Sequence, residues 1–216
     1  MTKPQLYKLP CILFVFVFIS ACSSLSTKKT TRTSLEKDNI CFIFKKNPHW
    51  YRAVDKAAKE WGVSIPMIMA IIQKESGFKH NARPIAPQKK GRKKKKKYLS
   101  SAYGYAQALD GTWKHYCKQT RRRFAQRDRF ADCAHFIGWY GAKSRNKCGI
   151  SKRDAYSHYL AYHEGHTGFN KRTHKKNKTL IRYAQAVAEQ TRLFKHQLKQ
   201  YQHNKSPKME KNSKKK

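Results

Sequence analysis

The segment from Ile65 to about Lys74 constrains the fold more than any other part of the chain. Every side chain from Met67 to Ile72 is apolar, so an α-helix here would be apolar on all sides. Ser64 can act as its N-cap, and Pro66 is tolerated in a first helical turn. A helix without a polar face is stable only when other elements surround it. The sequence therefore predicts a domain built around this helix.

Helical patterns on both sides supply the surrounding elements. Before the apolar segment, apolar side chains recur at helical spacing between Trp50 and Trp61, and Gly62 follows as a C-terminal stop. After it, the periodicity predicts helices at about 112–118, 124–140, 154–163 and 179–201. Residues 45–202 are thus expected to form one mainly α domain. A chain of about 160 residues is long enough for a proper core.

Glu75 stands at the end of the apolar segment and is the first candidate for chemistry. It continues the stripe of Met67 and Ile71 at four-residue spacing, which predicts that its carboxylate lies on a buried face. The negative end of the helix dipole and apolar surroundings would both raise the pKa of this carboxyl group towards the range of a general acid. The alternative is a glutamate that points into water at a helix end, the commoner fate of Glu.

Three short motifs in a fixed order bear on this choice. They are Glu75-Ser76-Gly77-Phe78, Ser101-Ala102-Tyr103-Gly104-Tyr105-Ala106-Gln107 and Ala161-Tyr162-His163-Glu164-Gly165. In this order they resemble the Glu-Ser, Gly-x-x-Gln and Ala-Tyr-Asn-x-Gly motifs of the soluble lytic transglycosylase (SLT) domain. The resemblance covers roughly residues 48–190 and implies a goose-type lysozyme-like helical fold.

The resemblance also implies a role for each matching residue. Glu75 would be the catalytic acid and base, and Ser76 would support its orientation beside the substrate. Gln107 would line the sugar groove, and Gly104 would let the backbone turn closely there. Tyr162 would approach the acid from the third motif. No metal and no cofactor are expected.

The third motif departs from the family at two positions. His163 replaces the usual Asn, and Glu164 adds a carboxylate, so both are further candidates for the substrate site. Glu164 could be a second catalytic carboxylate, but its place before Gly165 favours a structural role near a helix end. His163 has no companion ligands at metal-binding spacing. Aromatic residues that could stack on sugars, although most should belong to the core, are Tyr103, Tyr105, Trp113, Trp139 and Tyr140.

The activity that the resemblance implies is cleavage of the MurNAc–GlcNAc bond of peptidoglycan without water, which leaves 1,6-anhydro-MurNAc ends. One carboxyl group would act as acid and then as base, in place of the usual pair of carboxylates. Two alternatives stay open. One is a hydrolysing muramidase of the same fold. The other is a catalytically inactive lipoprotein that binds the cell envelope through its charge.

Residues 1–21 have the pattern of a lipoprotein signal peptide. The apolar run at 11–19 is too short to span a bilayer but suits a signal peptide. The Ile-Ser-Ala-Cys sequence that ends at Cys22 is similar to a bacterial lipobox, in which the cysteine is lipidated. An ordinary signal peptide that leaves Cys22 free is the alternative. Ser23 after the cysteine favours the periplasmic face of the outer membrane, with 22–44 as a flexible tether.

Charge points to anionic partners. The chain has 49 Lys and Arg against 12 Asp and Glu, a formal net charge of +37. Because export is predicted, lipid A phosphates or peptidoglycan carboxylates are favoured, and nucleic acid is not expected. A loop insertion at 84–100 concentrates the charge in Lys89, Lys90, Arg92, Lys93, Lys94, Lys95, Lys96 and Lys97. A merely solvated loop is the alternative, and the basic tail at 203–216 is expected to be disordered.

Four cysteines would remain besides Cys22 after export, namely Cys41, Cys117, Cys133 and Cys148. An oxidising periplasm permits two disulfides among them, in three possible connectivities. Free buried thiols are equally compatible with the sequence.

Overall fold

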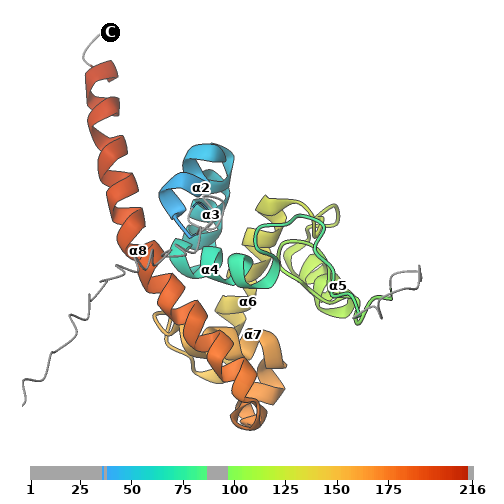
Figure 1. The fold of residues 1–216 in the computed structure, drawn as a ribbon. Coiled ribbons are helices and arrows are strands. Elements are labelled where there is room, and N and C mark those ends of the chain that lie inside the picture. The colour runs from blue at the N-terminus through green and yellow to red at the C-terminus, as the bar shows by residue number, and fades with distance from the viewer. Residues whose placement is uncertain (1–35, 37, 87–96, 214–216) are drawn as a thin grey trace, which may run out of the picture. The chain divides into compact units, whose positions relative to one another are not determined.

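The computed structural model describes residue 36, residues 38–86 and residues 97–213, with side chains up to residue 204. All of these belong to one compact unit of the chain. The helices are α2 (Ile40–Lys46), α3 (Pro48–Trp61), α4 (Ile65–Ser76), α5 (Asp110–Thr120), α6 (Phe130–Cys148), α7 (Ala155–Asn170), the short 3₁₀ helix η1 (Thr173–Lys176) and α8 (Lys178–Ser213) (Figure 1). The prediction of a mainly α domain is confirmed.

Helix α4 is the centre of the domain. All residues from Ile65 to Ile72 are buried, and α4 lies against α3, α6 and α8. The helix ends at Ser76, two residues later than the apolar pattern indicates, so Glu75 lies inside its last turn. Ser64 has the extended backbone of an N-cap, but its side chain makes no capping hydrogen bond. Ser64 is thus the N-cap residue, as predicted, although the side-chain hydrogen bond of a typical cap is missing.

Two other boundaries differ from those predicted. Helix α6 begins at Phe130 and not near residue 124, because Phe124 lies in the preceding loop with 89% of its surface exposed. The folded part of the chain also begins before residue 45. Ile40 and Phe44 of α2 are fully buried, so this end of the predicted tether packs into the core.

The last helix is longer than its apolar pattern. Its apolar side chains Leu180, Ala184, Val187, Phe194 and Leu198 are buried, and α8 lies against α4 and α7. The helix then continues to Ser213, through most of the segment 203–216 that the composition predicts to be disordered (Figure 1). None of the helices in the described ranges is both long enough and apolar enough to cross a membrane.

The basic insertion is closed at its base by backbone pairing. Ile85 and Tyr98 form an isolated antiparallel bridge. On either side of it, Ala86 N donates to Lys97 O at 2.9 Å and Leu99 N donates to Pro84 O at 3.0 Å. Residues 87–96, which carry all its predicted basic residues except Lys97, lie outside the described residues, as do the predicted signal peptide and Cys22.

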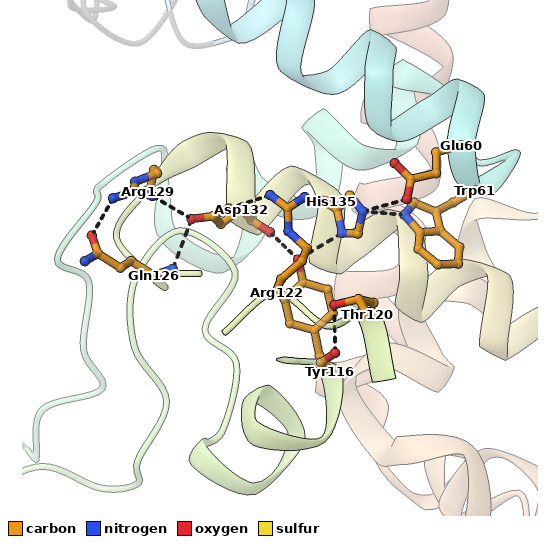
Figure 2. A network of polar contacts seen from close by, with 9 residues as sticks. All are labelled: Glu60, Trp61, Tyr116, Thr120, Arg122, Gln126, Arg129, Asp132 and His135. Carbon is orange, nitrogen blue, oxygen red and sulfur yellow. Dashed lines mark hydrogen bonds and ion pairs between the residues drawn. The ribbon is translucent and has the colours of Figure 1, made fainter. Parts of the chain in front are cut away.

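A buried ion pair fixes the loop between α5 and α6. Asp132, in the first turn of α6, is 4% exposed and accepts from Arg122 Nη2 at 2.7 Å and from the backbone N of Gln126 at 3.0 Å. Arg129 Nη1 lies 3.5 Å from the same carboxylate (Figure 2). Because a buried carboxylate needs such partners, the loop is held tightly against α6.

A buried histidine extends the network of Figure 2 to α3. His135 Nδ1 lies 2.9 Å from the Tyr116 hydroxyl, and its Nε2 lies 2.9 Å from Glu60 Oε1. Burial lowers the pKa of His135 below its ordinary value, and the hydrogen bond to Glu60 opposes that shift. This network joins α3, α5 and α6.

The four described cysteines, Cys41, Cys117, Cys133 and Cys148, are free thiols in the structure. Cys133 is buried, and burial raises the pKa of its thiol to about 12. Its Sγ donates to Arg127 O at 2.9 Å. In this arrangement Cys133 packs as a small apolar side chain with a weak donor.

Candidate active site

A cleft of about 410 Å³ opens beside the C-terminal end of α4. One wall is formed by residues of the 100–109 loop, the floor by α4 and α6, and the other wall by the middle of α7. The site residues predicted from the sequence that line it are Glu75, Gln107, Tyr162, His163 and Glu164. Segments that are up to about 90 positions apart in the sequence therefore meet around one space.

The Glu75 carboxylate has the electrostatics of an acid–base group. Burial raises its pKa from 4.5 to about 7, while a hydrogen bond from Tyr159 and the positive charge of Lys74 pull in the opposite direction. Its Oε1 is buried and has no hydrogen-bond partner among the described residues. A carboxyl group with such a pKa holds a proton for much of the time at neutral pH and can also give it up.

The same burial makes the pH dependence of stability testable. The ionised carboxylate is disfavoured in the folded protein, so wild-type stability should fall relative to that of Glu75→Gln as pH rises from 4.5 to about 7. Below pH 4.5 this contribution vanishes. At pH 8 the variant should gain about 1–2 kcal/mol, since water in the open cleft screens part of the penalty. Thermal unfolding at pH 4 and pH 8 measures the difference, and a gap that stays the same at both pH values would contradict it.

Gln107 is held so that its amide oxygen is the group offered to a ligand. Its Nε2 donates to Ala82 O and to Gly104 O, both at 2.8 Å. Two carbonyl acceptors identify that atom as the nitrogen. The amide oxygen has no partner among the described residues, and the side chain lines the cleft. The residue can therefore accept a hydrogen bond from a sugar hydroxyl or amide.

The turn that carries Gln107 depends on Gly104 and Arg127. Gly104 has φ +77°, and a Cβ atom there would overlap the Arg127 carbonyl oxygen. The Arg127 side chain donates to Ser101 O and to Ala108 O, both at 2.8 Å, and pairs with Asp110 at 2.7 Å. Arg127 thus ties together both ends of this cleft wall. Gly104 itself does not line the cleft but permits the close backbone approach.

Tyr162 connects the opposite wall to the same turn. Its hydroxyl donates to Ala106 O at 2.5 Å, and its ring lies 5.2 Å from the Tyr140 ring. Burial and the nearby Glu75 charge raise the pKa of Tyr162 well above its ordinary value, so it stays a neutral donor. Helix α7 is thereby joined to the second motif across the floor of the cleft.

The backbone of α7 breaks at Gly165, where φ is 74° and ψ is 160°. The break leaves Glu164 at the edge of the cleft, and its Oε2 accepts a hydrogen bond from the Thr173 hydroxyl of η1. Its other oxygen lies 3.7 Å from His163 Nδ1, and the His163 side chain is 46% exposed. Glu164 thus has one oxygen held by a hydrogen bond, while the other lies near His163 without one.

Ser76 does not line the cleft. It is buried, and its hydroxyl donates to Ile72 O at 3.0 Å, one turn earlier in α4. The side chain therefore supports the last turn of the helix, and no contact in the structure links it to the Glu75 carboxylate.

No group of three or more His, Cys, Asp or Glu that could bind a metal ion occurs within the described ranges.

A family model described as the transglycosylase SLT domain matches residues 10–201, which is most of the chain. The chain belongs to this family. No curated protein and no solved structure gives a significant match. Membership of the SLT family indicates a peptidoglycan lytic transglycosylase that binds peptidoglycan, and it confirms the resemblance drawn from the three motifs.

Some residues of the SLT cleft could not be assigned from the sequence. Phe136 and Tyr140 line its floor from α6, although the sequence groups Tyr140 only with aromatic residues that are mostly expected in the core. Tyr159, which hydrogen-bonds to Glu75, is 2% exposed. It precedes Tyr162 by three residues, so helical spacing places both on one face of α7. This spacing is the feature of the sequence that could have indicated Tyr159 as a residue of the site.

Proposed function

We propose that this SLT domain cleaves the MurNAc–GlcNAc bond of peptidoglycan without water and that Glu75 is its acid and then its base. The observation that carries the proposal is the Glu75 carboxyl group, which ends the buried helix α4 and lines the cleft with a pKa of about 7. A group with this pKa can both donate and accept a proton near neutral pH, as the two halves of the reaction require.

The reaction balances with one carboxyl group. Protonated Glu75 gives its proton to the glycosidic oxygen, and the bond from that oxygen to the anomeric carbon of MurNAc breaks. The acetamido oxygen of the same sugar can stabilise the positive charge that develops on this carbon. The Glu75 carboxylate then takes the proton of the C6 hydroxyl, and O6 bonds to the anomeric carbon. The 1,6-anhydro ring closes, and Glu75 is protonated again.

In this proposal the second motif contributes to binding of the sugar, and the third fixes the shape of the cleft. Gln107 Oε1 would accept a hydrogen bond from the bound sugar, and Tyr159 would hold the carboxylate in place by donating to it. Tyr162 would keep the two walls at a fixed separation through its bond to Ala106 O. None of these side chains needs to lose a proton in the reaction.

A hydrolysing muramidase is the second candidate, because Glu164 lines the same cleft. A hydrolase needs a base to activate water, usually a second carboxylate. We favour the transglycosylase because the Thr173 hydroxyl holds one oxygen of Glu164, which ties this carboxylate to η1 at the edge of the cleft.

Released muropeptides should therefore end in 1,6-anhydro-MurNAc, and Glu164→Gln should keep this product and a measurable fraction of the rate. The Thr173 hydroxyl can still donate to an amide oxygen, but more weakly than to a carboxylate, so the loss should appear mainly as a lower melting temperature. Mass spectrometry of products from purified sacculi distinguishes the two kinds of chain end, since anhydro ends are lighter than reducing ends by one water. Reducing ends from the wild type that disappear in Glu164→Gln would establish the muramidase instead.

We also propose that the enzyme is attached to the periplasmic face of the outer membrane through a lipid on Cys22. Its basic insertion would add electrostatic attraction to lipid A phosphates or peptidoglycan carboxylates, with Lys97 the one described member of that basic group. Such attraction between exposed charges weakens as salt rises. Both proposals, the lipid anchor and the attraction to anionic polymers, rest on the sequence alone.

A further inference from the structure

We propose that Arg83 forms a carboxylate-binding site at the mouth of the cleft, and that its ligand is the peptide borne by the glycan strand. The inference rests on the proposed function, since it assumes that peptidoglycan lies in the cleft. It adds a second recognition element to the site, which would bind the peptide and not the sugar.

The Arg83 guanidinium is held between two tyrosine rings. Its central carbon lies 4.2 Å from the centroid of the Tyr103 ring and 4.9 Å from that of the Tyr98 ring. Both distances are within the range of a cation–π contact. The Tyr103 hydroxyl is in turn fixed by Asp128 Oδ2 at 3.1 Å. A long and flexible side chain is thereby restricted to a narrow range of positions.

This arrangement leaves the hydrogen-bond donors of Arg83 available. Ring stacking uses the flat faces of a guanidinium, whereas its N–H groups point outward in its plane. Among the described residues no ion pair or hydrogen bond satisfies the Arg83 side chain, which is exposed. By contrast, Arg122 and Arg127 are each paired with an aspartate. Arg83 is thus a pre-positioned cation whose planar fork fits a carboxylate.

The position of Arg83 connects this cation to the cleft. The next residue, Pro84, lines the cleft, and so do Ser100 and Ala102, which lie between Tyr98 and Tyr103 in the sequence. Among the residues that the structure describes, the lining of the cleft contains no lysine or arginine. A peptide borne by a glycan strand in the cleft could then reach Arg83 from the side of Pro84.

The chemistry of peptidoglycan provides the matching group. Each MurNAc can carry a short peptide on its lactyl arm, and such peptides contain free carboxylates. A bidentate pair with Arg83 would favour strands that still carry peptides over bare glycan. Because the site is open to water, the contribution should be modest.

The test measures binding in a Glu75→Gln background, so that strands are not cut. The probes are soluble glycan strands with peptides and the same strands after an amidase has removed the peptides. Calorimetry gives the ratio of the two affinities. Arg83→Gln should lower the preference for peptide-bearing strands about fivefold, as expected for a partly exposed ion pair. Arg83→Lys, which keeps the charge but loses the planar fork, should restore only part of it.

Arg123→Gln is the matched control, because Arg123 is an exposed arginine of the α5–α6 loop and the substitution removes the same charge. It should leave the ratio of affinities unchanged. A preference that survives in Arg83→Gln, or that falls equally in Arg123→Gln, would overturn the assignment of Arg83. Binding of neither type of strand by the Glu75→Gln protein would instead overturn the proposed function.

Discussion

Glu75→Gln should slow the lysis of purified sacculi by at least about a hundredfold, the low end of what a single acid–base group contributes. Glutamine keeps the shape of the side chain, and its amide oxygen can still accept the hydrogen bond from Tyr159. It cannot protonate the glycosidic oxygen or take the proton of the C6 hydroxyl. Both halves of the proposed reaction are lost together. Turbidity clearing of sacculi gives the rate.

The matched control is Glu189→Gln, which makes the same chemical change on the exposed side of α8. Among the described residues, Glu189 pairs only with Arg192, in a surface contact one helical turn away. Its substitution should leave clearing within about twofold, because exposed ion pairs contribute little to stability. Near-normal clearing by a folded Glu75→Gln protein would show that another group performs the acid step.

The parts of this site that the sequence predicts are those set by local spacing. Met67, Ile71 and Glu75 share one face of a helix because they are four residues apart, and the structure places that face in the core and at the cleft. Likewise, Gly104 and Gln107 are three residues apart within a single tight turn. Periodicity and short motifs suffice for such features because they depend on the backbone of one element.

The parts that the sequence does not predict are contacts between distant segments. Arg127 follows Gly104 by 23 positions, and nothing in its local pattern indicates that it ties down the loop of the second motif. Thr173 restrains Glu164 only because α7 breaks at Gly165 and η1 folds back beside it. Helix ends were missed for a similar reason, since loop contacts such as those of Asp132 determine where α6 begins.

Ser76 shows the limit of transferring roles from a family. The motif next to the acid is present, and the resemblance implies support for the carboxylate. In the structure the hydroxyl instead bonds back to Ile72 O, a common arrangement for serine inside a helix. Tyr159, outside all three motifs, is the residue that donates to Glu75. A motif conveys which residues lie near the site, while the contacts of the folded protein decide which of them acts on the acid.

Gly104→Ala should be the most damaging change that leaves every polar group of the cleft intact. Gly104 has φ +77°, which costs an L-residue about 1–2 kcal/mol, and the new methyl group would overlap the Arg127 carbonyl oxygen. That oxygen already accepts from Tyr105 N at 3.1 Å and from Cys133 Sγ at 2.9 Å, so it cannot retreat without breaking both contacts. The wall that carries Gln107 would have to move instead.

We expect Gly104→Ala to lose at least about 3 kcal/mol of folding free energy, or about 10 °C in melting temperature for a domain of this size. Gly149→Ala is the control, because Gly149 has φ +67° but no atom within 4 Å of its Cβ position. It should lose only about 1 kcal/mol, the cost of backbone strain alone. Calorimetric unfolding of both variants separates strain from overlap. Equal melting temperatures would mean that the Arg127 loop yields freely, and the second motif would then not depend on it for its shape.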